Sequence, residues 1–309
     1  MDRRRATGVV ALALAACTRA YAQSLIPNVS GTLESYFVNN PQTRGVQSLL
    51  WYGQLDYHPS NEFNFDASYF LYPGGNGFDE LYARAQIDRF SVRVGRIWTQ
   101  FGLDSWADLY YTGFNQLPLV RQIDLVGDEE LTRQDSGAEV TYNNAATQVT
   151  GAIFDDNLGD NQVLPEKVDH ASLRVQQGFG AFIGGLDFLS SFDGDEKVYG
   201  FDGRFTEPNL IVRAEGYWGQ GAYPAYGYYI DGSYRIPKLY RTQVVTRFEQ
   251  AKPWNTSLGT LTTMGIRQGV TQYLSLNLNY SFGTPLTVAE YGQVDYTGWS
   301  VQAMLRFAF

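Results

Sequence analysis

The feature that most constrains the fold of this chain is a series of short segments in which apolar and polar side chains alternate. In FNFDASYFL, residues 63–71, every second residue is apolar, and Asn64, Asp66 and Ser68 stand between them. A β-strand places successive side chains on opposite faces, so this period of two predicts strands with one apolar and one polar face. The same pattern recurs in residues 49–57, 81–88, 274–282 and 301–309. Counting along the chain predicts about sixteen strands and no long helix.

The connections between these segments alternate between long and short. The short ones read HPSNE, DR, NNAA, QGFG, EPN, IPK and RQG, which are rich in turn-forming residues. The long ones include NNPQTRGVQ, PGGNGFDE and SSFDGDEK, as well as a stretch of about 35 residues after Trp98. Outer-membrane barrels have short turns at one end and long loops at the other. The sequence therefore predicts an all-β, transmembrane antiparallel β-barrel rather than a soluble sandwich.

The N-terminus has the pattern of a secretory signal peptide. Asp2 and three arginines precede the apolar run GVVALALAA, and Ala20-Tyr21-Ala22 offers a cleavage site. We expect residues 1–22 to be removed and residues 23–309 to form one barrel domain. The alternative is Leu14-Ala15-Ala16-Cys17, which resembles a lipobox and would make Cys17 a lipidated terminus.

Composition excludes several classes of protein. Removing residues 1–22 takes away four arginines and one aspartate, a net +3, and the formal charge moves from −9 to −12. Such acidity argues against binding to nucleic acid, which needs clustered cations. No later stretch approaches the roughly 18 apolar residues of a membrane helix. The 15% aromatic content and 32 glycines suit a barrel with a wet lumen.

The segment Val94-Gly95-Arg96, the following FGL at residues 101–103 and the terminal Phe309 resemble the Gram-negative outer-membrane porins. The resemblance is to the broad group that includes phosphate- and polyphosphate-selective porins. It implies an inward-folded third outer loop that narrows the pore, and it implies that the barrel assembly machinery recognises Phe309. It also implies a location in the Gram-negative outer membrane, among its lipid, as a homotrimer. The candidates for the constriction loop are Asp104, Asp108, Arg121 and Asp124.

Two other roles are open for this loop: it caps the outer vestibule, or it packs against a neighbouring subunit. Its length of itself indicates a function, because structureless connections beyond about 15 residues are uncommon. Its aromatic and leucine residues between Trp106 and Leu119 give it an apolar face that suits docking on the barrel wall.

Charged residues opposite the apolar set of each strand are expected to face the lumen, because an arginine facing lipid at the midplane costs roughly 2 to 4 kcal/mol. The predicted pore-wall arginines are Arg84, Arg93, Arg96, Arg174, Arg204 and Arg213. The same rule adds Arg235, Arg241, Arg247, Arg267 and Arg306, and the carboxylates Glu34, Asp56, Asp66, Asp88, Glu139, Asp187, Asp202, Glu215 and Asp231. Arg96 breaks the alternation, which predicts a β-bulge at Gly95. Most wall arginines are expected to neutralise wall carboxylates.

These features predict a water-filled channel for passive diffusion of small hydrophilic solutes and ions. The loops carry acidic clusters at Asp155, Asp156 and Asp160 and at 193–196, which favours a weak preference for cations. The alternative is a substrate-specific porin, for example for anions or phosphate. The lysine-rich path of the phosphate-selective relatives is missing, since four lysines are present, so that selectivity is not carried over.

A less favoured alternative is an outer-membrane barrel enzyme. The chain has two histidines, His58 and His170, and its single cysteine lies in the signal peptide. A nucleophile and a base within hydrogen-bond reach are needed for such catalysis. The acidic clusters fit no EF-hand spacing. We therefore expect no catalytic residue, no metal site and no cofactor.

Overall fold

The computed structural model describes residues 28–39, 44–72, 75–98, 100–103, 112–115, 118–122, 134–155, 165, 167–221, 225–252, 258–284, 286–288, 292–294 and 297–308. Most of these residues lie in β-strands, and α3 (Leu119–Gln122) is a short helix. Across these ranges, no α-helix has both the length and the hydropathy that crossing a bilayer requires.

Sixteen strands form the wall of the barrel. The first eight are β1 (Asn28–Asn39), β2 (Arg44–Tyr57), β3 (Phe63–Tyr72), β4 (Gly75–Ile87), β5 (Phe90–Trp98), β6 (Gln134–Asn144), β7 (Thr147–Asp155) and β8 (His170–Phe179). The other eight are β9 (Phe182–Ser191), β10 (Glu196–Glu207), β11 (Leu210–Gly221), β12 (Tyr226–Arg235), β13 (Thr242–Lys252), β14 (Gly259–Gly269), β15 (Leu274–Thr284) and β18 (Gly298–Ala308). A separate two-stranded sheet, β16 (Leu286–Val288) and β17 (Gly292–Val294), lies between β15 and β18 in the sequence.

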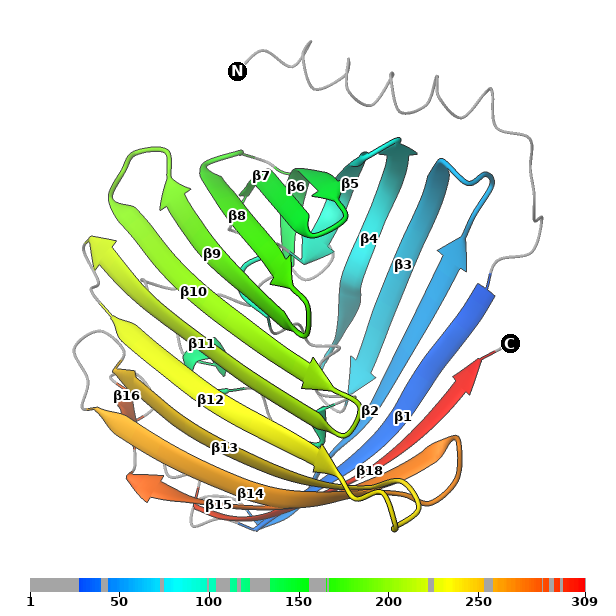
Figure 1. Ribbon diagram of the computed structural model, residues 1–309, viewed down its shortest axis with the longest axis vertical. Helices are drawn as coiled ribbons and strands as arrows, with labels where there is room; N and C mark the ends of the chain where they lie inside the picture. Colours follow the sequence, from blue (N-terminus) through cyan, green and yellow to red (C-terminus); the bar gives the residue numbers. More distant parts are fainter. Residues whose placement is uncertain are drawn as a thin grey trace.

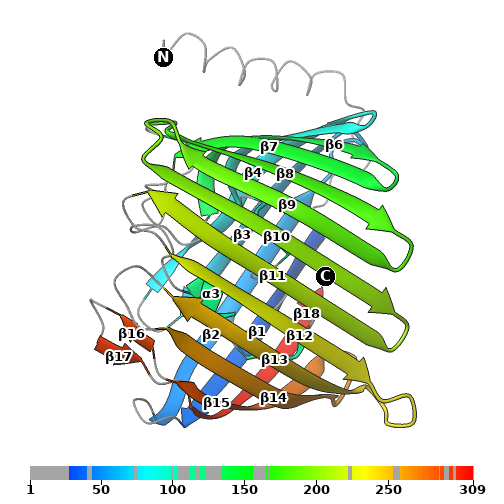
Figure 2. The same cartoon turned by 60° about the vertical axis from the view of Figure 1, so that its left-hand side comes forward.

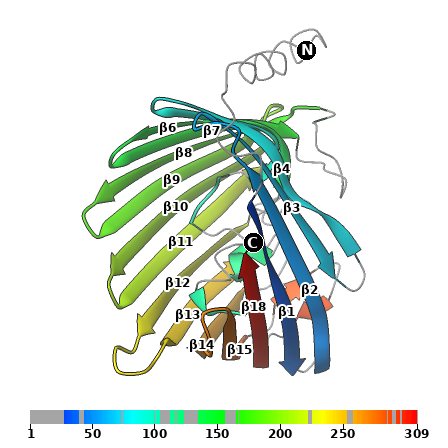
Figure 3. The ribbon, with the colours of Figure 1, turned by 90° about the vertical axis from the view of Figure 1, so that its right-hand side faces the viewer.

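The sheet is antiparallel and closed. Successive strands pair with each other, and β15 pairs with β18 past the inserted two-stranded sheet. Closure comes from β1 and β18, which pair from Ser30↔Ala308 to Asn39↔Trp299 and lie side by side in Figures 1 and 3. Closing the sheet leaves the wall without a free strand edge. The predicted antiparallel barrel of about sixteen strands is confirmed.

The two faces of the wall differ in polarity. On β12, Ile230 is 48% exposed on one face, whereas the next residue, Asp231, is 4% exposed on the other. On β14, Ile266 is 49% exposed and Thr263 is 1% exposed. The exposed face is apolar along most strands, as a wall surrounded by lipid requires. The polar positions therefore form the inner face.

The barrel has two different ends, which lie to the right and to the left in Figure 2. At the short-connection end, Asp88 and Arg89 join β4 to β5, and residues 180–181 join β8 to β9. The long-connection end carries residues 99–133 between β5 and β6 and residues 156–169 between β7 and β8. Strand β1 begins and β18 ends at the short-connection end.

One long loop of the sequence prediction is absent. Residues 73–80 were predicted as a loop, but β4 begins at Gly75, and Tyr72 pairs with Gly75. The polar residues there extend the hairpin because strand pairing satisfies the backbone N–H and C=O groups of both segments. Sorting of connections by length therefore holds less strictly than the sequence indicated.

The β-bulge predicted at Gly95 is wrong. Pairing of β5 with β4 and with β6 runs through Gly95 without a shift of register. Instead, the backbone of Gly95 adopts φ +136°, and a Cβ atom at this position would lie 2.3 Å from the carbonyl oxygen of Leu81. Glycine permits this torsion and this approach because it has no Cβ. The break in alternation before Arg96 is thus a change of torsion, not an extra residue.

Candidate functional site

The connection between β5 and β6 contacts the inner face of distant strands at its beginning. The ring of Phe101 lies 5.3 Å from the ring of Tyr217 on β11. The N–H of Gly102 donates to Asp187 Oδ1 on β9 at 3.0 Å, and the N–H of Leu103 donates to Glu215 Oε1 on β11 at 2.9 Å. Carboxylates of the inner face therefore bind backbone groups that would otherwise need water or another acceptor.

The middle of the same connection contacts β13 and β18. Gln243 Nε2 on β13 donates to the carbonyl oxygen of Thr112 at 3.4 Å. The guanidinium carbon of Arg247 lies 4.5 Å from the centre of the Phe114 ring, a cation–π geometry, and Phe114 is 1% exposed. Asn115 Nδ2 donates to Ser300 Oγ on β18 at 2.9 Å.

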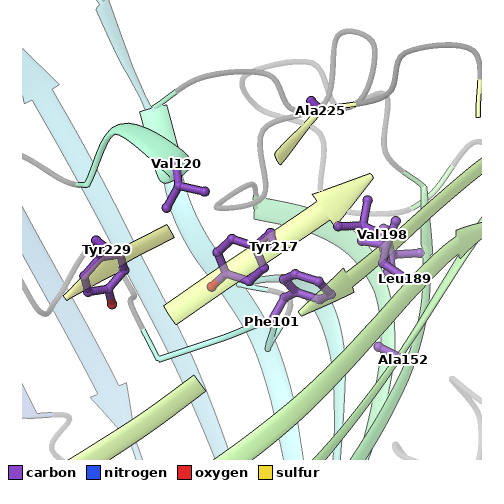
Figure 4. Packing of buried hydrophobic residues seen from close by; sticks show 9 residues of the cluster. Phe101, Val120, Ala152, Leu189, Val198, Tyr217, Ala225 and Tyr229 are labelled. Atoms are coloured by element: carbon purple, nitrogen blue, oxygen red, sulfur yellow. The ribbon is translucent and has the colours of Figure 1, made fainter. Parts of the chain in front are cut away.

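Helix α3 lies against β12 and β13. The N–H of Leu119 donates to Glu249 on β13. Val120 packs against the backbone of Gly227 on β12, so closely that a Cβ atom added to Gly227 would lie 2.8 Å from Val120 Cγ2. Figure 4 shows the apolar cluster that contains Val120. Its members are Phe101, Val120, Ala152, Phe154, Leu189, Val198, Tyr217, Ala225 and Tyr229. The inner face thus carries apolar residues beside the polar ones where the connection packs against it.

On the inner face of the wall, arginines pair with carboxylates on neighbouring strands. Arg93 Nε and Nη2 donate to the two carboxylate oxygens of Glu139 at 2.9 and 2.8 Å. Arg213 Nε and Nη2 donate to the two oxygens of Asp231 at 3.0 and 2.5 Å. Such forked pairs fix both side chains as well as neutralise their charge.

Two further arginines of the wall are neutralised in the same region. Arg174 Nη1 lies 2.7 Å from Asp187 Oδ1 and 2.6 Å from Asp202 Oδ2. Arg247 Nε donates to Glu249 Oε1 at 3.0 Å. All five side chains are nearly inaccessible. The carboxylates that bind the connection, Asp187 and Glu249, are therefore the same ones that hold these arginines.

Arg96 lies in a row of buried polar residues. It pairs across the sheet with Ser136 on β6, which in turn pairs with Asp155 on β7. The three residues are 5%, 0% and 3% exposed. Asp155 also accepts a hydrogen bond from the N–H of Lys167 at 3.0 Å. Arg96 is therefore held within the wall near the long-connection end.

The remaining predicted residues fall in different places. Arg84 and Arg204 occupy inner-face positions near the short-connection end, on β4 and β10. The backbone of Arg121 belongs to α3. The residues that lie outside the described part of the chain are Asp104, Asp108, Asp124, Phe309 and the predicted signal peptide.

The long-connection end carries an acidic cluster around one histidine. His170 Nδ1 lies 2.9 Å from Asp169 Oδ1, and its Nε2 lies 3.5 Å from Glu196 Oε2. In the turn between β9 and β10, hydrogen bonds from Ser191 Oγ and the N–H of Asp195 lower the pKa of Asp193. This turn therefore stays negatively charged at neutral pH.

Sequence reasoning missed the apolar inner-face residues and Glu249. A signal exists for the apolar ones, because alternation gives way to consecutive apolar residues at these places. Examples are Ala152-Ile153-Phe154 and Tyr228-Tyr229-Ile230. One member of each run faces lipid and another faces the connection, so both faces are apolar. Glu249 carries no such signal, since its acceptor role depends on Leu119, 130 residues away.

The sequence of the chain matches no protein-family model and no curated protein. Its fold is similar to OmpF of Salmonella typhi, solved in complex with daunomycin, with TM-score 0.66 and 11% identity over 92% of this chain and 97% of that chain. The outer membrane channel DcaP of Acinetobacter baumannii gives TM-score 0.64 and 9% identity over 92% and 97%. The trimer form of the outer membrane protein OmpT of Vibrio cholerae gives TM-score 0.61 and 12% identity over 92% of this chain and 98% of that chain.

At these identities the likeness establishes the fold alone. The chain has the closed antiparallel barrel of the Gram-negative porins. A closed wall satisfies every backbone group without water, and this wall exposes apolar side chains around its outside. Fold and exterior together support a location in the bacterial outer membrane.

Proposed function

We propose that this protein is a porin-type channel of the outer membrane, through which small hydrophilic solutes and ions diffuse passively. The observation that carries the proposal is the connection between β5 and β6, whose described parts contact inner-face residues of β9, β11, β12, β13 and β18. A barrel of about sixteen strands is wide enough for an aqueous passage. A segment bound along its inner face would set the width of that passage.

In this proposal the third long connection is folded inward and forms the constriction. Leu103 and Thr112 are bound to the wall on either side of Asp104 and Asp108. Arg121 belongs to α3, and Asp124 follows that helix by two residues. These four charged residues are the candidates for contact with permeating ions, as the resemblance to porins implies.

Conductance in planar bilayers tests the channel and the constriction together. The purified barrel should give stable single-channel steps. Deleting residues 106–116 should raise the conductance and the solute size limit, and Glu215→Ala should raise them less, because it removes the acceptor for the N–H of Leu103. Glu207→Ala, an exposed residue at the short-connection end, is the control. No conductance from a folded barrel would refute the channel, and an unchanged size limit after the deletion would refute the constriction.

The proposed channel prefers cations weakly. Asp193, Asp195 and Glu196 supply negative charge at the long-connection end, where it concentrates cations. Reversal potentials across a salt gradient measure the preference, and Asp104→Asn with Asp108→Asn should reduce it. An anion preference in the unmodified protein would favour the alternative, a substrate-specific anion or phosphate porin.

An enzymatic role is the less favoured proposal. The two histidines lie at opposite ends of the barrel: His58 follows β2 at the short-connection end and pairs with Asp56 at 2.7 Å, and His170 begins β8 at the other end. They therefore do not form a joint acid–base site. A hydrolytic activity abolished by His170→Ala, with conductance intact, would support the enzyme.

Assembly partners complete the proposal. We expect recognition of Phe309 by the barrel assembly machinery, so deleting Phe309 should lower the yield of heat-modifiable barrel far more than Arg306→Gln. We also expect a homotrimer, in keeping with the trimer form of OmpT. Cross-linking in isolated outer membranes should give a trimer band, and a monomer band alone would refute it.

A further inference from the structure

Five arginines occupy inner-face positions near the short-connection end, each within three residues of the end of its strand. They are Arg84 on β4, Arg204 on β10, Arg235 on β12, Arg267 on β14 and Arg306 on β18. We refer to these five residues as the arginine rim. Strands β10, β12, β14 and β18 are alternate strands of the barrel, so four of the five follow one another around the wall at every second strand.

Three members of the arginine rim are not neutralised by the described part of the chain. None of the ion pairs there involves Arg84, Arg204 or Arg235. Arg84 donates to the neutral groups Ser91 Oγ at 2.9 Å and Gln86 Oε1 at 3.2 Å, and Arg204 and Arg235 are exposed. Arg267 and Arg306 have partners of their own, so we count uncompensated charge from the other three.

Two of these arginines stand directly opposite another arginine. Arg84 pairs in register with Arg93, and Arg204 pairs with Arg213. In both pairs the second arginine takes the available carboxylate, Glu139 or Asp231. Like charges placed directly opposite each other destabilise a sheet. The stability of the wall therefore does not explain why arginine occupies positions 84 and 204. Contact with anions in the lumen would explain it.

Acidic residues on the inner face near this end are few, because Glu62 and Asp88 are exposed in turns and Glu207 ends β10 on the face opposite to that of Arg204. Asp56 on β2 and Asp66 on β3 face each other in register. His58 Nε2 lies 2.7 Å from Asp56 Oδ2, and Asn64 Nδ2 donates a hydrogen bond to Asp66 Oδ2 at 2.6 Å. Both lie on strands that carry no member of the arginine rim. The charge of the rim is thus positive around β10 to β18.

The long-connection end has the opposite sign. Asp193 and Asp195 are exposed in the turn between β9 and β10, and Asp169 and Glu196 flank His170. Lys167 Nζ, however, lies 3.1 Å from Asp169 Oδ2 and offsets the charge of that carboxylate. Between the two ends, Arg174 and Arg247 are paired with carboxylates. Charge along the axis therefore runs from acidic, through neutralised, to basic.

We propose that the arginine rim is an anion-attracting vestibule that, together with the acidic opposite mouth, makes the channel rectify current. This inference rests on the proposed channel function and adds the solute class of one end: small anions bearing carboxylate or phosphate groups. Each charged end concentrates its counterion within a Debye length, about 10 Å at 0.1 M salt. With the long-connection side positive, cations enter past the acids and anions enter past the rim, so both accumulate inside. Reversing the polarity empties the passage of both.

Single-channel current at opposite voltages of about 100 mV tests this inference. In about 0.1 M KCl the unmodified protein should pass roughly twofold more current at one polarity, and the ratio should approach one at about 1 M, where the Debye length falls to about 3 Å. Orientation is read from Lys238→Cys in a Cys17→Ser background, with an impermeant thiol reagent in one chamber. The larger current should flow with the long-connection side positive.

The variant that tests the rim is Arg84→Gln with Arg204→Gln and Arg235→Gln. It should bring the current ratio near one and shift the reversal potential further towards cations. The matched control, Arg89→Gln with Lys238→Gln and Arg241→Gln, removes three cations from turns at the same end and should change both measurements much less than the rim variant, because these side chains lie outside the lumen. If the triple variant yields too little barrel, Arg204→Gln alone should halve the excess current.

Three results would overturn the inference: a conducting channel with equal currents at both polarities in low salt, larger current at the reverse polarity, or rectification that survives the rim variant. Each leaves the proposed channel standing. Failure of the channel itself would appear differently, as a folded barrel without conductance.

Discussion

Arg213 and Arg204 occupy directly opposed positions on neighbouring strands, yet one is a paired arginine of the wall and the other belongs to the arginine rim. Arg213 is 6% exposed and forms a forked pair with Asp231, and it represents the paired arginines. Arg204 is exposed, makes no ion pair with a described carboxylate, and represents the short-connection end. The comparison teaches that residue type and facing direction do not fix the role of a wall arginine. Its partners decide whether the charge is structural or is available to permeating ions.

The largest expected difference between the two arginines is in stability. Arg213→Met should lower the free energy of unfolding by about 3 to 5 kcal/mol, because it leaves Asp231 buried without its partner. Arg204→Met should change it by less than about 0.5 kcal/mol, since the side chain is exposed. Urea unfolding of the barrel in lipid vesicles, followed by tryptophan fluorescence, measures both. Equal losses in the two variants would abolish the distinction.

Glycines offer a second contrast between the middle of the wall and the short-connection end. Gly95→Ala should cost more than about 2 kcal/mol, because the added Cβ meets the carbonyl oxygen of Leu81 and φ is unfavourable. Gly180→Ala, in the turn between β8 and β9, should cost about 1 kcal/mol, because φ is +62° but no atom lies within 4 Å. The yield of heat-modifiable barrel and the urea midpoint both report the difference. If Gly95→Ala leaves stability unchanged, the backbone around Gly95 and Leu81 can shift enough to accommodate the added Cβ.

The connection that packs on the inner face allows a third test, through conductance. Phe114→Ala should raise single-channel conductance by a few tens of per cent, roughly what loosening one docked segment allows, because Phe114 covers the guanidinium of Arg247. Phe205→Ala, an exposed aromatic on the outer face of β10, is the matched control. Should both variants conduct like the unmodified protein, the packing of Phe114 does not hold the connection in place.

The smallest expected effect comes from the exposed acids of the long-connection end. Asp193→Asn with Asp195→Asn should shift the reversal potential towards anions by a few millivolts at about 0.1 M salt, and by less at about 1 M, because salt screens exposed charge. Glu207→Gln, which removes an exposed acid at the other end, should shift the reversal potential by less than this double variant does at either salt concentration. A shift that persists undiminished at high salt would place these acids at the narrowest part of the passage rather than at its mouth.

The strands were predictable because their signal is local. Alternation over residues 63–71 or 274–282 identifies a strand and its two faces without knowledge of its neighbours. The turn at Asp88-Arg89 was predictable for the same reason, whereas the turn predicted at QGFG, residues 177–180, is displaced, because β8 continues to Phe179. Residues 73–80 were not, because their polarity suits both a loop and an extended hairpin, and pairing between β3 and β4 decided for the hairpin. The bulge at Gly95 failed because alternation cannot distinguish an extra residue from an unusual torsion.

By itself, the sequence determined the all-β class, the closed barrel of about sixteen strands and the apolar exterior, since these follow from period and from the cost of exposing charge to lipid. Only the tertiary structure decided which carboxylates face which cations. Glu139 meets Arg93 from 46 residues away, and Glu249 accepts from Leu119 across 130 residues. Such pairs depend on register and on barrel closure, and neither is written in the alternation of a single strand. The sequence therefore places a charge on the inner face, and its neighbours in space determine what that charge does.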